Sequence, residues 1–211
     1  MLKRLYLVIL AVAGFSPAAL AASPVARVIF LGDSITEGYG VNKSAAYPEL
    51  IAEALPAKVH HPIKVINAGV SGSTTASAVS RLKWLLKGPT QPTLLVIALG
   101  GNDGLRGLDV KAMQQHLTEA VRYAKAHGIQ QVLIAGMQMP PNYGQGYLRE
   151  FAAVFPAVAK AEQTALLPFL LDGVGGDPKL NQADGIHPNG AGQQRIAQTV
   201  LQAILPLLGN N

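Results

Sequence analysis

Residues 26–38 read ARVIFLGDSITEG, and the change of character within this stretch decides the fold. The segment from Ala26 to Leu31 is a short, mostly apolar run bounded by Gly32, which predicts a buried β-strand. Small and polar residues follow at once and lead into a segment that favours a helix. A strand that passes through a short polar loop into a helix is the unit from which α/β folds are built.

The same unit recurs along the rest of the chain. Further strands are predicted at residues 63–67, 93–99, 131–136 and 169–171. Amphipathic helices are predicted at residues 74–86, between the N-cap Asp109 and Gly128, at residues 147–163 with a kink at Pro156, and through Ile196, Val200 and Ile204 to about Pro206. The alternation predicts one domain, a three-layer α/β/α sandwich around a five-stranded parallel sheet.

The N-terminal residues have the pattern of a signal peptide. Lys3 and Arg4 precede an apolar run of about 11 residues, shorter than the roughly 20 that span a bilayer. Ala19-Leu20-Ala21 matches a small-x-small cleavage site, and the short run disfavours the alternative of an uncleaved anchor. We therefore expect residues 1–21 to direct export to the periplasm. Residues 22–211 are then the mature domain, with no stable membrane anchor after cleavage.

The composition excludes several classes of protein. An apolar fraction of 49% and a charged fraction of 14% over 211 residues are typical of a globular domain and exclude a disordered chain. Without Lys3 and Arg4 the net charge falls from +5 to +3, and the remaining basic residues are scattered, which argues against nucleic-acid binding. The absence of cysteine excludes disulfides, cysteine-based zinc sites and a thiol nucleophile.

Loops of glycine and small polar residues follow the ends of several predicted strands. They comprise residues 32–38, 68–73, 100–104 and 184–189. The carboxyl ends of parallel strands share one edge of a sheet, and open α/β sheets bind their ligands there. The sequence therefore predicts that these loops converge on one site.

His187 is the histidine best placed for proton transfer. It lies in a loop bounded by glycine and proline, whereas the other histidines precede a strand or lie in a predicted helix. Asp184, three residues earlier, is within reach of Nδ1, which would leave Nε2 free to face a partner. The alternative is a turn in which Asp184 caps the backbone and His187 only leads into the last helix.

Ser34 has several possible roles when its segment is considered alone. The loop lacks the G-x-G-x-x-G and P-loop patterns of nucleotide sites and the G-x-S-x-G pattern of α/β-hydrolases. What remains is a nucleophile at a strand end, where free N–H groups stabilise an anion, or a plain helix N-cap. Asn102 could direct an amide toward the same anion or could be an ordinary turn residue.

Together, the segments Gly32-Asp33-Ser34, Gly69, Gly100-Gly101-Asn102-Asp103 and Asp184-Gly185-Ile186-His187 resemble the four sequence blocks of the SGNH, or GDSL, hydrolase family. The resemblance extends over about residues 27–205 and is strongest to the bacterial arylesterase branch, which is related to thioesterase I/lysophospholipase L1. It implies a flavodoxin-like fold and a catalytic triad of Ser34, Asp184 and His187. It also implies an oxyanion hole formed by the N–H groups of Ser34 and Gly69 and the Asn102 side chain, and neither a cofactor nor a metal.

The loops at residues 104–108 and 137–147 are expected to border the site. Their residues Leu105, Leu108, Met139 and Tyr143 suit an alkyl chain, because apolar and flexible side chains pack against methylene groups. The expected substrate is a small-molecule ester with an aryl leaving group or a short-to-medium acyl chain, with thioesters and lysophospholipids as further possibilities.

Two other functions are compatible with the same scaffold. A carbohydrate O-acetylesterase would be expected to carry an aromatic platform for sugars, but Trp84, the only tryptophan, lies in a predicted helix away from the site. A non-catalytic periplasmic binding protein would be favoured by loss of Ser34, Asn102 or His187, and all three residues are present.

Overall fold

A five-stranded parallel sheet lies at the centre of the computed structural model, which describes residues 25–88, 90–129 and 131–209. The strands are β1 (Arg27–Gly32), β2 (Lys64–Gly69), β3 (Thr93–Ala98), β4 (Gln131–Ala135) and β5 (Ala165–Leu167). Their order in the sheet is β2-β1-β3-β4-β5, that of flavodoxin-like folds.

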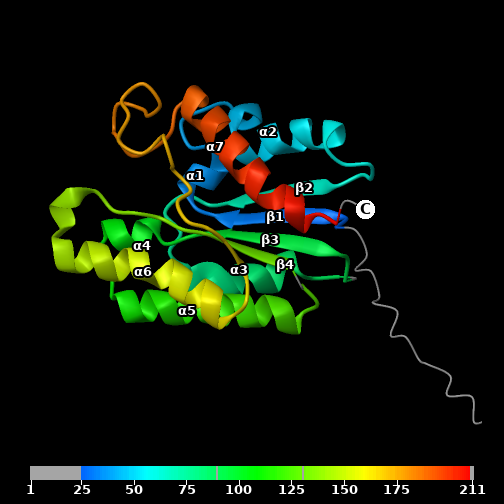
Figure 1. Ribbon diagram of the computed structural model, residues 1–211, viewed down its shortest axis with the longest axis horizontal. Coiled ribbons are helices and arrows are strands. Elements are labelled where there is room, and N and C mark those ends of the chain that lie inside the picture. The colour runs from blue at the N-terminus through cyan, green and yellow to red at the C-terminus, as the bar shows by residue number, and fades with distance from the viewer. Residues whose placement is uncertain (1–24, 89, 130, 210–211) are drawn as a thin grey trace, which may run out of the picture.

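Helices cover both faces of the sheet (Figure 1). One face carries α1 (Ser34–Glu37), α2 (Tyr47–Ala54) and α7 (Gly190–Ile204), and the other carries α3 (Ala78–Leu85), α4 (Gly101–Leu105), α5 (Val110–Ala126) and α6 (Gln145–Ala161). Short 3-10 turns occur at Lys43–Ala45, Leu55–Ala57, Thr75–Ser77, Pro141–Tyr143 and Leu205–Leu207. The three-layer sandwich predicted from the sequence is thereby confirmed.

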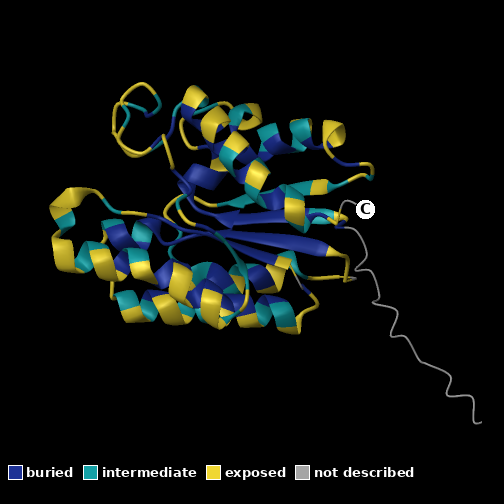
Figure 2. Ribbon diagram, viewed as in Figure 1, coloured by how far each residue is buried: buried dark blue, intermediate teal, exposed yellow. Residues whose placement is uncertain are grey.

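The core lies on both faces of the central strands. All six residues of β3 are buried, and Figure 2 shows the middle of the sheet as continuously buried between helices whose outer faces are exposed. Parallel strands covered on both faces consist of nearly uninterrupted apolar residues, which explains why the sequence signals of β1 and β3 are strong.

The fifth strand is not where the sequence pattern predicted it. Residues 169–171 were expected to form it, but β5 is Ala165–Leu167, paired with β4. Pro168 lacks the N–H that would continue the ladder, so it ends the strand. Phe169 and Leu171 follow in the turns beyond, where both line an apolar cavity.

Two helices were absent from the prediction. α2 has no side-chain N-cap and its buried residues are only Tyr47, Pro48 and Ile51. α4 was expected to be a loop, because its sequence contains Gly101, Asn102 and Gly104, which ordinarily disfavour helices.

A buried hydrogen-bond network fixes α1 against its neighbours. Gln193 of α7, fully buried, accepts from the Tyr47 N–H (2.9 Å) and donates to the Ile35 carbonyl (3.1 Å). The hydroxyls of Thr36 and Tyr47 lie 2.9 Å apart. The first, second and last helices are therefore joined by polar contacts beneath the loops that carry the candidate site.

The signal peptide predicted for residues 1–21 lies outside the described residues. Within residues 25–88, 90–129 and 131–209, none of the helices combines the length and the apolar character needed to cross a bilayer.

Candidate active site

Ser34 is the first residue of α1, directly after the turn that follows β1. The Asp33 carboxylate caps this helix by accepting from the Ile35 N–H (3.0 Å). A side chain at Gly32 would collide with that of Thr36, so the turn needs glycine to be this tight. The result is a serine that is 9% exposed at the carboxyl edge of the sheet.

Asp184 and His187 meet Ser34 from the far end of the chain. His187 Nε2 lies 3.0 Å from Ser34 Oγ, although the two residues are 153 positions apart. On its other side, His187 Nδ1 lies 2.7 Å from Asp184 Oδ2. The order Ser–His–Asp is that of a nucleophile, a base and a carboxylate that orients the base.

The Asp184 carboxylate is held in its charged form by hydrogen bonds. Its Oδ1 accepts from the backbone N–H groups of Ile186 (2.9 Å) and His187 (3.0 Å). Together with the His187 side chain, these donors lower the pKa of Asp184 from 3.8 to about 2, the His187 N–H contributing most. Asp184 therefore remains a carboxylate at neutral and mildly acidic pH.

Asp33 is in the opposite situation. Burial raises the pKa of Asp33 to about 6, although the Ile35 N–H and the charges of His187 and Arg81 favour the carboxylate. Arg81 of α3 lies beneath the site and donates to the carbonyls of Gly32 (2.9 Å) and Ala68, the ends of β1 and β2. Asp33 thus braces the helix start, and Arg81 braces the strand ends.

The raised pKa of Asp33 predicts that Asp33→Asn stabilises the fold, and that the gain in stability depends on pH. The folded state binds a proton between pH 3.8 and about 6 that the unfolded state has lost, so the wild type loses stability as pH rises through this window. The variant keeps an oxygen for the Ile35 N–H and has no charge to bury. Its advantage in the free energy of unfolding should approach about 3 kcal/mol at pH 8 and shrink below pH 5. Denaturant unfolding at both pH values measures it, and an advantage independent of pH would contradict the prediction.

Two of the predicted oxyanion donors lie at helix starts. Ser34 N–H, in the first turn of α1, has no acceptor among the described residues. Asn102, in the first turn of α4, donates one Nδ2 hydrogen to the Ser73 carbonyl (3.0 Å), which leaves the other hydrogen of the amide available.

The geometry does not support Gly69 as the third donor. Its N–H donates to Asn67 Oδ1 (3.0 Å), so this hydrogen is already engaged. A side chain at Gly69 would lie 2.1 Å from the Glu37 nitrogen, so close packing of α1 against β2 explains the glycine. The sequence pattern identified a required glycine but not the reason for it.

Gly72, three residues later, carries a backbone N–H that the sequence pattern did not single out as an oxyanion donor. Its φ is +76°, and its N–H has no acceptor among the described residues. The loop around it is held by the Ser71 N–H, which donates to Glu37 (2.7 Å), and by Ser73, which accepts from Asn102. The available signal was a second glycine in the same polar loop, next to Ser73.

Asp103 serves to hold that loop in place. It is 2% exposed, and its carboxylate accepts from both the N–H (2.9 Å) and the hydroxyl (2.6 Å) of Thr75. Asp103 therefore ties the segment after β2 to the helix that carries Asn102.

An apolar cavity of about 400 Å³ lies between the nucleophile and base segments. Its lining includes Ile35, Leu105, Met137, Met139, Phe169, Leu171 and Ile186. Two predicted acyl contacts, Leu105 and Met139, belong to this cavity.

The other two predicted acyl contacts, Leu108 and Tyr143, are not among its lining residues. Leu108 is 41% exposed, and its carbonyl accepts from the Tyr147 hydroxyl (3.2 Å). The Tyr143 hydroxyl donates to the Leu105 carbonyl (3.1 Å). Tyr143 therefore does not line the cavity but holds the backbone of Leu105, which does.

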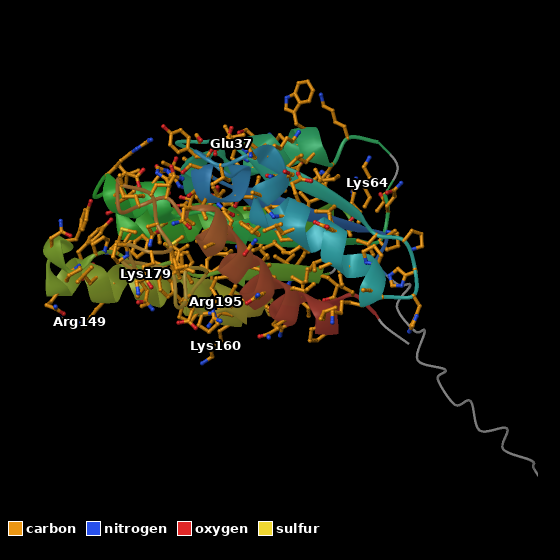
Figure 3. The ribbon with its side chains drawn as sticks, turned by 90° about the horizontal axis from the view of Figure 1, so that it is seen from above. Glu37, Lys64, Arg149, Lys160, Lys179 and Arg195 are labelled. Carbon is orange, nitrogen blue, oxygen red and sulfur yellow. The ribbon has the colours of Figure 1, made fainter. Side chains whose placement is uncertain are left out.

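The site lies at the carboxyl edge of the sheet, where Ser34 follows β1. In Figure 3, Lys179 in the loop before Asp184 and Lys64 at the start of β2 lie toward opposite ends of the molecule, and Glu37 at the end of α1 lies between them. In the part of the chain that the structure describes, no three His, Cys, Asp or Glu side chains gather as metal ligands.

The chain is similar to esterases and acylhydrolases over most of its length. A model of the GDSL-like Lipase/Acylhydrolase family matches residues 30–195. Esterase TesA of Pseudomonas aeruginosa is 44% identical over 181 residues, which cover 86% of this chain and 89% of that protein. Thioesterase 1/protease 1/lysophospholipase L1 of Escherichia coli is 36% identical over 184 residues, which cover 87% of this chain and 86% of that protein. The structure of the psychrotrophic esterase EstA from Pseudoalteromonas sp., inhibited by monoethylphosphonate, has a TM-score of 0.81 and 32% identity, with 88% of this chain and 100% of that chain covered.

Proposed function

Because the chain belongs to the GDSL-like lipase/acylhydrolase family and is a carboxylic ester hydrolase, we propose that it acts through Ser34 as nucleophile, His187 as general base and Asp184 as the carboxylate that orients His187. The observation that carries this proposal is the unbroken chain of contacts from Ser34 Oγ to His187 Nε2 (3.0 Å) and from His187 Nδ1 to Asp184 Oδ2 (2.7 Å). This arrangement can activate a serine hydroxyl without a cofactor.

The first half of the reaction forms an acyl-enzyme. His187 Nε2 takes the Ser34 proton as Oγ attacks the carbonyl carbon of the ester, and the carbonyl oxygen becomes an oxyanion. Asp184 holds Nδ1–H and stabilises the imidazolium. The proton on Nε2 then passes to the departing alcohol or thiol as its bond to the acyl carbon breaks.

The second half releases the acid. A water molecule loses a proton to His187, attacks the acyl carbon and displaces Ser34, which regains the proton. We propose the N–H groups of Ser34 and Gly72 and the amide of Asn102 as the oxyanion donors, in place of Gly69. Removal of one such donor commonly lowers kcat by about 10²–10³.

The apolar cavity is the proposed acyl site. It is lined by Ile35, next to the nucleophile, and by Ile186, next to the base, so an acyl chain on Ser34 can enter it. Its volume, about 400 Å³, is within the usual range for ligand pockets. An apolar lining suits alkyl esters and thioesters better than acetylated sugars. Trp84, the only tryptophan, is 74% exposed on α3 with Lys87 above its ring and does not belong to this cavity.

A panel of substrates tests the acyl site. We expect kcat/KM for 4-nitrophenyl esters to rise from acetyl toward octanoyl, since each buried methylene contributes about 0.8 kcal/mol. Leu105→Ala should lower kcat/KM for the octanoyl ester about fivefold and change the acetyl ester little. Leu108→Ala, outside the cavity, is the matched control and should match the wild type.

The same panel, extended to acyl-CoA thioesters, lysophospholipids and acetylated sugars, ranks the remaining leaving groups. A rate that stays flat from acetyl to decanoyl would remove the basis for an acyl cavity. Faster turnover of acetylated sugars than of alkyl esters would favour the O-acetylesterase alternative.

We also propose that the enzyme acts after export to the periplasm. The support is the pattern of Lys3, Arg4 and the apolar run that follows, ahead of Ala19-Leu20-Ala21.

A further inference from the structure

Tyr39, just beyond α1, covers the catalytic imidazole. Its ring centroid lies 4.7 Å from that of His187, at an interplanar angle of 44°. Tyr39 is 53% exposed, a large fraction for an aromatic residue. Because Tyr39 is so exposed, burial of its ring in the core does not account for its position against His187. Other contacts must hold it there.

The Tyr39 backbone is fastened to both halves of the triad. Its N–H donates to the carbonyl of Ser34 (3.0 Å), and its own carbonyl accepts from Gln182 Nε2 (2.7 Å). Gln182 in turn donates its backbone N–H to the His187 carbonyl (2.8 Å) and its side-chain amide to the Pro188 carbonyl (3.1 Å). Tyr39 and Gln182 therefore form a bridge between the nucleophile segment and the base segment.

Gly40 makes room for this bridge. A side chain at Gly40 would lie 2.1 Å from Gln182 Oε1, and the φ of +76° at Gly40 is itself disfavoured for other residues. The contact between Tyr39 and Gln182 therefore also depends on glycine at position 40.

We propose that Tyr39 is a positioning residue for His187, held in place by Gln182. The contacts of His187 with Asp184 and Ser34 fix the positions of its two nitrogens. The imidazole could still rotate about the axis through Nδ1 and Nε2, and the Tyr39 ring limits that rotation. When His187 accepts the Ser34 proton, the aromatic face also lies against a cation, which it attracts. The inference rests on the proposed roles of Ser34 and His187.

The test separates positioning from substrate contact. Tyr39→Ala should lower kcat for 4-nitrophenyl acetate about three- to thirtyfold with KM unchanged, from the usual strength of a cation–π contact. Tyr39→Phe keeps the ring and should retain the wild-type kcat. Gln182→Ala should fall between the two. The loss should have the same factor for acetyl and octanoyl esters, because it acts through His187 and not through the acyl chain.

Trp84→Ala, which removes an exposed aromatic ring from α3, is the control and should leave kcat unchanged. The inference is overturned if Tyr39→Ala stays within twofold of the wild type, if the loss lies in KM, or if Tyr39→Phe is as impaired as Tyr39→Ala. Wild-type protein without esterase activity would instead refute the proposed function, so the two failures are distinguishable.

Discussion

Ser34→Ala is expected to lower kcat for 4-nitrophenyl acetate by about 10⁴-fold or more while the fold stays intact. The alanine removes the Ser34 Oγ that lies 3.0 Å from His187 Nε2 and leaves the helix cap, in which Asp33 accepts from the Ile35 N–H, unchanged. Circular dichroism and the thermal midpoint should match the wild type. The activity that remains should come from the oxyanion donors and substrate binding alone.

A phosphonate ester provides an independent measurement of the same prediction. One equivalent should stop wild-type turnover and add its mass to the peptide that contains Ser34, and Ser34→Ala should take up no label. Ser80→Ala, at an exposed serine of α3 that donates to the Ser77 carbonyl, is the matched control and should be labelled normally. Equal turnover by Ser34→Ala and wild type, or a label on another residue, would refute the nucleophile assignment.

Asp184→Asn is expected to lower kcat by as much as about 10⁴-fold at neutral pH with little loss of stability. The amide oxygen can still accept from the Ile186 and His187 N–H groups, so the loop is retained. The amide nitrogen, however, would face His187 Nδ1 and favour the tautomer that carries its proton on Nε2. That tautomer cannot accept the Ser34 proton.

Kinetics at pH 6–9 with the 4-nitrophenyl ester measure this effect. Since Asp184 has a pKa of about 2, its carboxylate should not limit the wild-type rate anywhere in that range. Asp172→Asn, an exposed aspartate in the preceding turn, is the matched control and should keep full activity. A loss below tenfold for Asp184→Asn would show that His187 does not depend on this carboxylate.

The residues that meet at the site were predictable because strand polarity determines them. Ser34 and Asn102 were expected together from their positions just after β1 and β3, because parallel strands bring their carboxyl ends to one edge of the sheet. His187 was expected there as well, but it lies well beyond the end of β5 at Leu167, so the docking of the last loop also contributes to its position. The Asp109 cap of α5, which accepts from the Ala112 N–H (2.7 Å), was also predictable, because capping depends on residues close in sequence.

The features that the sequence could not predict depend on specific contacts between residues, such as strand pairing and side-chain hydrogen bonds. The apolar runs on either side of Pro168 are similar, and only pairing with β4 selects Ala165–Leu167 as the strand. The Gly69 N–H is engaged by Asn67, a choice of rotamer that a glycine pattern does not contain. The place of Tyr39 against His187 likewise depends on Gln182, which lies 143 residues away.

The contact between Ser34 and His187 joins the first strand's loop to the last loop of the chain. With the proposed roles of Ser34 and His187, a nascent polypeptide has no activated nucleophile until its final segment has been synthesised and has docked. The buried amide of Gln193 ties that docking to the helix that carries Ser34. Ester cleavage should therefore begin only when the fold is complete. Its onset during refolding reports the docking of the last segment, and incomplete chains should have no esterase activity.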